Sequence, residues 1–366
     1  MKAWAKLRDY NMNPFIVIWE VTRACALKCL HCRAEAQYRR DPRELTFEEG
    51  KHLIDEIAMM DSPLLVFTGG DPFMRPDLFE LAKYAIDEKN LSVSITPSAT
   101  PRVTRRAVEK AKEAKLSRWA FSLDGSCAEI HDHFRGTKGS YDLTMRGIEY
   151  LKELEIPIQI NTTVSKYNLE DLPDIAVKVK EMDAVLWSVF FLVPTGRGLK
   201  KDMISPEEHE RVMKWLYQIR QTMPYDVKVT EAPHYRRVFL QESKRQGKAN
   251  VSQTDRRKDF LGRAPKTVND GDGFVFISHI GEVYPSGFLP VVCGNVRKEP
   301  LWRIYRESPI MRVLRDKSKL KGKCGVCEFK AICGGSRSRA YAVTGDYLES
   351  DPYCSYIPEG FQSGKF

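Results

Sequence analysis

The chain has 366 residues, 42% hydrophobic and 29% charged, which is ordinary for a globular protein of two domains. Its apolar runs are far shorter than the ~20 residues of a membrane-spanning helix, and residues 1–8 lack a secretory signal core, so we expect a cytoplasmic protein without a membrane partner. The net charge of +9 attracts polyanions, but zinc-finger, homeodomain and RNA-binding patterns are missing, so no nucleic-acid partner is expected.

Short apolar or β-branched runs alternate with amphipathic helical stretches from the start of the chain. The predicted strands are residues 15–21, 64–68, 91–95, 118–123, 157–164 and 186–193, and the predicted helices include 47–60, 77–88, 104–115 and 169–182. Six strand–helix repeats indicate parallel strands joined by crossovers. We therefore predict an α/β fold with a partial (β/α)6 TIM-like barrel, whose site lies at the carboxyl ends of the strands.

The pattern changes near residue 225. A basic stretch over 234–263, predicted to be irregular, precedes a predicted hairpin over 274–278 and 282–285 and a helix near 301–306. We therefore predict two domains, residues 1–225 and residues 226–366.

Cys25, Cys29 and Cys32 follow the first predicted strand, with spacings of three and two residues between them. Three thiolates are one fewer than a fully ligated [4Fe–4S] cluster takes, so one iron is left open for chemistry. The spacing does not match the paired motifs of tetrahedral zinc sites.

A second cysteine group lies near the end of the chain. Cys324, Cys327, Cys333 and Cys354 suffice for a complete iron–sulfur cluster, and they also fit a structural Cys₄ zinc site. Cys293 has no assigned role.

Further motifs accompany the first cysteines. The run from Thr68 through Gly69 and Gly70 to Pro72 ends the second strand, and the run 121–125 ends the strand 118–123. Paired glycines let a backbone approach a ligand closely, although an ordinary turn also explains them. Arg135, downstream, can pair bidentately with a carboxylate or form a surface salt bridge.

Taken together, these motifs resemble those of the radical S-adenosylmethionine (SAM) superfamily. The resemblance implies that Cys25, Cys29 and Cys32 carry the catalytic [4Fe–4S] cluster with its open iron. It further implies a set of SAM-binding residues, namely His31, Gly69, Gly70, Asp71, Pro72, Ser122, Asp124, Arg135 and Asn161. The usual acid at the position of Asp71 is Glu, a mild departure. The loop 194–198 is expected beside the adenine.

The resemblance also implies the reaction type. Such enzymes cleave SAM reductively to a 5′-deoxyadenosyl radical, which abstracts hydrogen from a substrate, and they need an electron donor such as ferredoxin or flavodoxin. The C-terminal part resembles a SPASM-type α+β domain, which implies one auxiliary [4Fe–4S] cluster on Cys324, Cys327, Cys333 and Cys354. Ser286 and Ser336 stand where many relatives carry Cys, which speaks against a second auxiliary cluster.

Residues 231–237, 334–346 and 351–354 resemble a subgroup that modifies tetrapyrroles in haem biosynthesis. The expected substrate is therefore a tetrapyrrole bearing carboxylates, gripped by Arg236, Arg237 and Arg263 unless the basic stretch is a solvated face. In this interpretation His234 or Tyr235 acts as an iron ligand or proton donor. The alternatives are a peptide-modifying SPASM maturase and a non-enzymatic iron–sulfur electron carrier.

Overall fold

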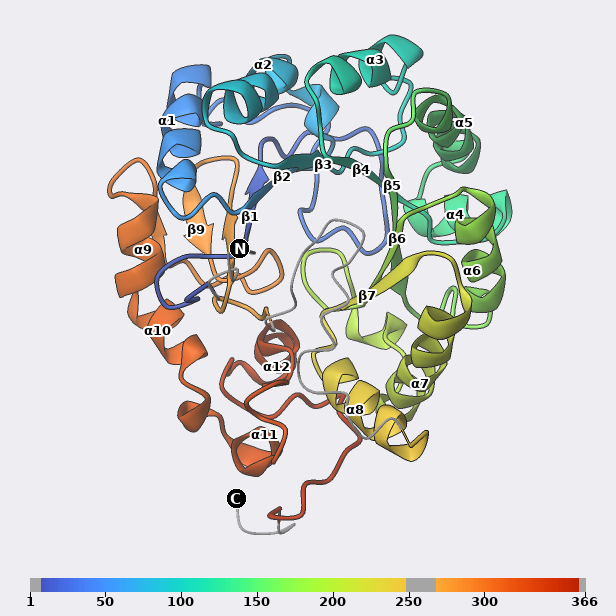
Figure 1. Ribbon diagram of the computed structural model, residues 1–366, viewed down its shortest axis with the longest axis vertical. Coiled ribbons are helices and arrows are strands. Elements are labelled where there is room, and N and C mark those ends of the chain that lie inside the picture. The colour runs from blue at the N-terminus through green and yellow to red at the C-terminus, as the bar shows by residue number, and fades with distance from the viewer. Residues whose placement is uncertain (1–7, 248–267, 362–366) are drawn as a thin grey trace, which may run out of the picture.

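A curved ten-stranded sheet forms the centre of the computed structural model, which describes residues 8–247 and 268–361 (Figure 1). Within these residues the strand order is β10-β9-β8-β1-β2-β3-β4-β5-β6-β7, and every neighbouring pair from β8 to β7 is parallel. The strands are β1 Ile16–Glu20, β2 Leu64–Thr68, β3 Val93–Ile95, β4 Arg118–Ser122, β5 Ile158–Val164, β6 Leu186–Phe191, β7 Asp226–Thr230, β8 Phe274–Ile277, β9 Glu282–Tyr284 and β10 Gly294–Asn295. The predicted α/β fold with a partial TIM-like barrel is confirmed.

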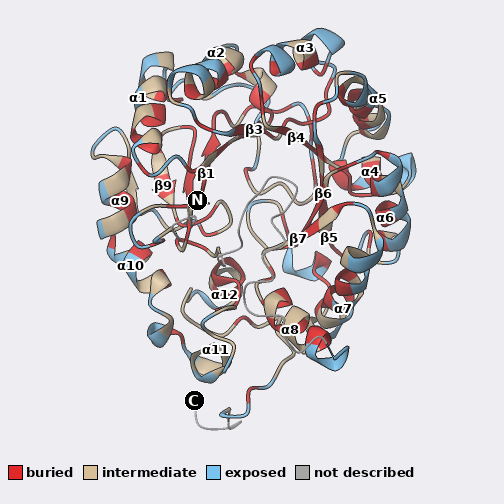
Figure 2. Ribbon diagram, viewed as in Figure 1, coloured by how far each residue is buried: buried red, intermediate tan, exposed pale blue. Residues whose placement is uncertain are grey.

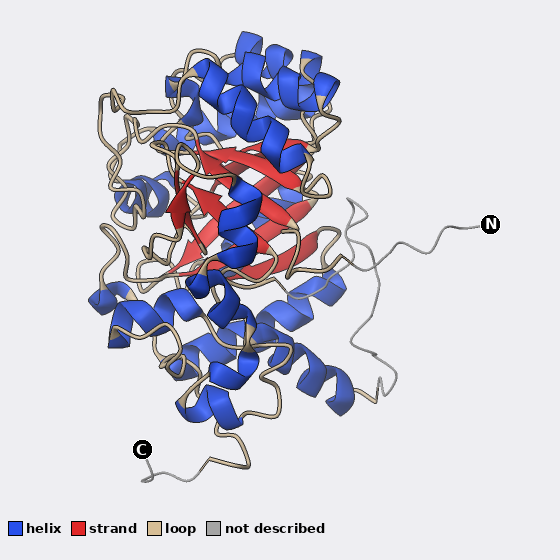
Figure 3. Ribbon diagram, turned by 90° about the vertical axis from the view of Figure 1, so that its left-hand side faces the viewer, coloured by secondary structure: helices blue, strands red, loops and turns tan. Residues whose placement is uncertain are grey.

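Helices surround the outside of this arc (Figure 1). In chain order, the helices of the described residues are α1 Phe47–Ala58, α2 Leu78–Lys83, α3 Arg105–Glu113, α4 Ala128–Arg135, α5 Ser140–Glu153, α6 Leu172–Glu181, α7 Pro206–Thr222, α8 Tyr235–Arg245, α9 Leu301–Glu307, α10 Pro309–Arg315, α11 Gly322–Val326 and α12 Arg337–Thr344. Their outward faces are exposed and their inward faces are buried (Figure 2). Helices α8, α11 and α12 lie beyond one end of the sheet in both views (Figures 1 and 3). None of the helices that the structure describes is long and apolar enough to cross a membrane.

Local sequence explains where several helices begin. Thr46 and Glu49 form a capping box at the start of α1, and Ser205 and Glu208 form another at the start of α7. Thr104 accepts a hydrogen bond from the backbone of Ala107 and caps α3, as predicted. Each cap satisfies backbone N–H groups that have no partner inside the helix.

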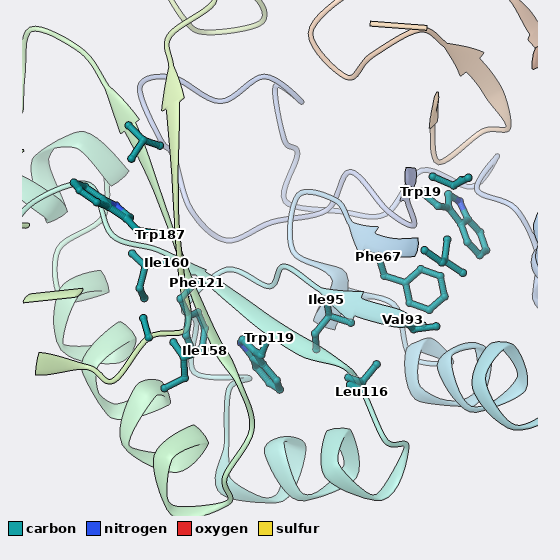
Figure 4. Close-up of a cluster of buried hydrophobic side chains, with 14 of the residues drawn as sticks. Trp19, Phe67, Val93, Ile95, Leu116, Trp119, Phe121, Ile158, Ile160 and Trp187 are labelled. Atoms are coloured by element: carbon teal, nitrogen blue, oxygen red, sulfur yellow. The ribbon is translucent and has the colours of Figure 1, made fainter. Parts of the chain in front are cut away.

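The hydrophobic core lies between the sheet and the outer helices. Trp19, Trp119 and Trp187 are completely buried there, together with Phe67 and Phe121 (Figure 4). Strand β5 shows the underlying alternation, because every second residue is buried against the helices and the residues between them are half-buried on the inner face. The inner faces of the strands therefore point into the arc.

Three sequence predictions need correction. Residues 235–245 of the stretch expected to be irregular form helix α8, while residues 248–267, which include Arg263, lie outside the described residues. The helix expected over 77–88 is α2 followed by a π-helical segment, Tyr84–Glu88. Strand β7, which extends the sheet beyond β6, was not foreseen, and the predicted strand 274–278 is β8, whose parallel pairing with β1 was not foreseen. Residues 226–230 thus belong to the same sheet as β1–β6, and the two-domain division at residue 225 stays a prediction.

Candidate active site

The arc encloses a cavity of about 360 Å³, lined by residues of the strands from β1 to β8 other than β3, and of the loops that follow the strands. Cys25, Cys29 and Cys32 lie in its wall, on the loop after β1. So do the predicted SAM-binding residues His31, Gly69, Gly70, Ser122, Arg135 and Asn161. The parallel topology brings these residues together because the carboxyl ends of parallel strands meet at one edge of the sheet.

The thiols of the cysteine loop are largely withdrawn from solvent. Cys25 and Cys29 are each 7% exposed, and the Sγ atom of Cys25 lies 3.5 Å from the Oγ atom of Ser98. Burial raises the pKa of Cys29 to about 11 and also raises the pKa of Cys25. A buried thiolate therefore needs a positive partner, and a bound iron–sulfur cluster supplies one as it displaces the thiol protons. The donor set fits the cluster that the sequence predicted.

Three glycines from other loops lie in close contact with the backbone of the cysteine loop. A Cβ atom at Gly70 would lie 2.5 Å from the carbonyl oxygen of Ala24, and one at Gly136 would lie 2.3 Å from that of Lys28. At Gly196 it would lie 2.5 Å from the carbonyl oxygens of both Cys32 and Arg33. Each glycine thus lets a separate loop pack directly on the cysteine loop. We call these three glycines the glycine clamp.

Arg197 strengthens the same contact. Its Nε atom donates a hydrogen bond of 2.9 Å to the carbonyl oxygen of Cys29, and its Nη1 atom donates one of 3.4 Å to that of Ala36. The loop 194–198, predicted to lie beside the adenine, therefore contacts the backbone that carries the thiols.

Asp71 and Pro72 lie behind the cavity wall. The carboxylate of Asp71 is fully buried, and it accepts hydrogen bonds from the backbone of Phe73 at 3.2 Å and the hydroxyl of Thr100 at 3.0 Å. Burial raises its pKa to about 6. The side chain thus ties the turn after β2 to the segment after β3. That Asp71 and Pro72 bind SAM stays a prediction.

Arg135 forms a buried ion pair, not the surface salt bridge that was its alternative. Its Nη1 atom lies 3.3 Å from the Oδ2 atom of Asp124, whose other oxygen accepts a hydrogen bond of 2.7 Å from the backbone of Thr163. His31 stacks on Phe134 at 4.2 Å, and burial lowers its pKa well below the usual value. Asp124 therefore orients the guanidinium that faces the cavity, and does not itself line it.

The cavity wall also contains charged residues to which sequence reasoning assigned no role. Lys228 on β7 and Glu231 just after it line the cavity, together with Arg33 from the cysteine loop. The signal for Lys228 in the sequence was the alternation of residues 226–230, which marks a strand with Lys228 and Thr230 on its inner face. Ser98 was missed as well, although it follows the third strand at the expected edge.

The predicted carboxylate-binding residues divide between two places. Arg236 lines the large cavity and donates a hydrogen bond of 3.0 Å to the carbonyl oxygen of Ile332. Arg237 faces away from the large cavity and is paired with Glu210 at 2.9 Å, so its predicted role is wrong. The roles suggested for His234 and Tyr235 are also wrong, because neither residue lines the large cavity.

The four C-terminal cysteines share a second, smaller cavity. Cys324, Cys327, Cys333 and Cys354 all line it, and burial raises the pKa of Cys333 to about 12 and that of Cys354 to about 11. Cys293 is separate, with its thiol directed at the carbonyl oxygen of Val291. Among the described residues, no three His, Cys, Asp or Glu side chains form a group that could hold a metal ion.

His234 adds an independent indication that this second cavity takes a ligand. The imidazole is 1% exposed and lines the cavity. Its Nδ1 atom lies 3.7 Å from the Oδ2 atom of Asp351, but neither ring nitrogen makes a hydrogen bond to the residues described. A buried polar group without a partner is costly, and the sulfur atoms of a cluster would supply an acceptor. The residues present therefore fit a four-thiolate cluster.

Comparison with known proteins gives a consistent result. The sequence profile described as "Radical SAM superfamily" matches residues 19–179. The "AdoMet-dependent heme synthase" of Methanosarcina barkeri is 44% identical over 345 residues, covering 94% of this chain and 97% of that protein. The "Fe-coproporphyrin III synthase" of the same organism is 33% identical, covering 94% and 88%. Among solved structures, Streptococcus suis SuiB bound to S-adenosylmethionine has a TM-score of 0.72 at 16% identity, covering 94% of this chain and 78% of SuiB.

Proposed function

Because the chain belongs to the radical SAM superfamily and is similar in sequence to haem-biosynthesis enzymes, we propose that it oxidises the side chains of a carboxylate-bearing tetrapyrrole. The likeness to the heme synthase covers nearly the full length of both chains. Removal of a hydrogen atom from the propionate carbon attached to the ring, followed by loss of one further electron, releases carbon dioxide and leaves a vinyl group.

One observation carries the proposal: three cationic side chains line the same cavity as the three thiols. Arg33, Lys228 and Arg236 come from three separate elements and all line this space. Cationic groups of this kind recognise carboxylates. A substrate with several propionates would therefore lie beside the open side of the cysteine loop.

When bound, the [4Fe–4S] cluster and SAM supply the hydrogen-abstracting chemistry. Cys25, Cys29 and Cys32 would hold the cluster. Arg135, oriented by its ion pair with Asp124, would bind the carboxylate of SAM, with Ser122 and Asn161 on the neighbouring strands β4 and β5 facing the same space.

Another part of the cavity wall is apolar. Its wall includes Ile16 and Ile18 of β1, Val66 of β2, and Phe274 and Phe276 of β8. Such a lining excludes water and offers few reactive groups near the site of hydrogen abstraction. Only the strand pairing of β8 with β1 places the two phenylalanines there.

We also propose one auxiliary [4Fe–4S] cluster on Cys324, Cys327, Cys333 and Cys354. Two observations support it: four thiols line one cavity, and the ring nitrogens of the buried His234 on that cavity make no hydrogen bond among the described residues. Such a cluster would accept the electron that leaves the substrate, and a ferredoxin or flavodoxin would supply electrons for the cleavage of SAM.

Anaerobic reconstitution with iron and sulfide tests these proposals. We expect about eight irons per chain, as two four-iron clusters require. Fe-coproporphyrin III should increase the release of 5′-deoxyadenosine and should lose carbon dioxide from its propionates. About four irons would contradict the auxiliary cluster. Eight irons without a tetrapyrrole response would contradict the substrate and favour the peptide alternative.

A further inference from the structure

Glu231 has an unusual conformation at the wall of the large cavity. It directly follows β7, and its φ angle of 59° lies in the left-handed region that side chains other than glycine rarely adopt. Such backbone strain persists only where surrounding contacts enforce it. Here the enforcing contacts come from the C-terminal part of the chain.

Helix α12 fixes both the side chain and the backbone of Glu231. The hydroxyl of Ser336, the N-cap of α12, donates a hydrogen bond of 2.8 Å to the Oε2 atom. The guanidinium of Arg339 donates to the backbone carbonyl oxygen of Glu231. Among the described residues no donor contacts Oε1, so this oxygen is the one available to a molecule in the cavity.

Two carboxylates lie among the charged groups around Glu231. Asp270 precedes β8 and Asp351 lies in the C-terminal loop, and both carboxylates raise the pKa of Glu231. Arg339 is the opposing cation, but it also pairs with Asp351 at 3.2 Å. Lys228 and Arg236 are the other charged residues on this side of the cavity. Burial is the main cause that raises the pKa of Glu231, and with the two carboxylates it brings the pKa to about 8.

We propose that Glu231 is a neutral carboxylic acid that donates a hydrogen bond to a carboxylate of the substrate. This inference rests on the proposed function, because it requires a substrate with carboxylates in this cavity. An ionised Glu231 would repel such a substrate, whereas the protonated form offers a donor on an oxygen held in place by α12. Low-dielectric sites are known to keep carboxylic acids neutral for this purpose.

The consequence is a pH-dependent affinity. If only protonated Glu231 accepts the substrate, affinity is constant below the pKa of Glu231. Above that pKa the dissociation constant rises by up to about tenfold per pH unit, because the proton must be taken up on binding. The propionates of a porphyrin are ionised throughout this range and add no such step.

The test is equilibrium binding of Fe-coproporphyrin III to the anaerobic, reconstituted enzyme without reductant, followed by Soret absorbance from about pH 6.5 to about pH 9.5. We expect the dissociation constant of the wild type to be flat at low pH and to rise above about pH 8. Glu231→Gln keeps a neutral donor of the same size, so its profile should be flat and close to the wild-type value at low pH. Thr230→Val alters the same cavity wall but removes no titratable group, so its dissociation constant should rise with pH as that of the wild type does.

Each other outcome overturns the inference in a recognisable way. An equal rise of the dissociation constant with pH in the wild type and in Glu231→Gln would assign the pH dependence to another group. If Glu231→Gln does not fold, the wild type decides alone, and a dissociation constant independent of pH refutes the inference. Absence of binding at every pH in wild type and Thr230→Val would refute the proposed function, and this inference with it.

Discussion

The glycine clamp makes a sharp prediction, because substitution of Gly196 should displace the cysteine loop. A Cβ atom there would lie 2.5 Å from two carbonyl oxygens, whereas ordinary contacts begin near 3.4 Å. Relief of both clashes requires a shift of about 0.9 Å, the difference between these distances. Overpacking of this kind typically costs about 1–3 kcal/mol. Displacement of reacting groups by about 1 Å costs on the order of 100-fold in rate.

The matched control is Gly345→Ala. Gly345 has a similar left-handed φ angle, 79° against 59° for Gly196, but a Cβ atom at Gly345 would meet nothing within 4 Å. Both variants therefore carry the backbone strain of about 1–3 kcal/mol, and only Gly196→Ala carries the clash.

The assay is the rate of 5′-deoxyadenosine release by anaerobically reconstituted enzyme with SAM and dithionite, with iron content measured in parallel. We expect Gly196→Ala to be slower than wild type by about 10- to 100-fold, and Gly345→Ala to remain within about twofold of wild type. Equal rates for the two variants would show that the clamp does not position the cysteine loop.

Three further predictions concern the cysteines and one buried acid. Cys29→Ala should abolish release of 5′-deoxyadenosine, because two thiolates cannot hold the cluster, whereas the exposed Cys127→Ala should not; normal release by Cys29→Ala would contradict the cluster assignment. Cys327→Ala should still cleave SAM but lose porphyrin product, and product at the wild-type rate would make the second site structural or empty. The pKa of Asp71 is raised to about 6, so its proton contributes stability that is lost as pH rises from about 4 to about 6, up to about 3 kcal/mol. Thermal unfolding should therefore show that the stability of Asp71→Asn increases relative to that of the wild type over this pH range. A stability difference that does not change with pH would refute the raised pKa of Asp71.

The sequence determined the local features of this protein. The first six strands, the N-cap at Thr104 and the position of Cys25, Cys29 and Cys32 after β1 all follow from patterns within a few residues. Hydrophobic periodicity and capping act between near neighbours in the chain, so they can be recognised without tertiary contacts. The same spacing rules indicated the superfamily.

Only the tertiary structure decided how distant segments complete the site. Strand β8 pairs with β1 across more than 250 residues, and this pairing places Phe274 and Phe276 in the cavity wall. Helix α12 likewise sets the conformation of Glu231 from about a hundred residues away. No periodicity in the sequence encodes such contacts, because they depend on the packing of complete elements.

The placement of charged residues was the least predictable part. His234 and Arg237 belong to the same short run as Arg236, yet Arg236 lines the large cavity while the other two line the second one. Their sequence context is a single basic stretch, and the irregular structure expected there gave no basis for separating them. Helix α8 separates them, because consecutive residues of a helix point in different directions around its axis, and this rotation distributes adjacent side chains between two sites.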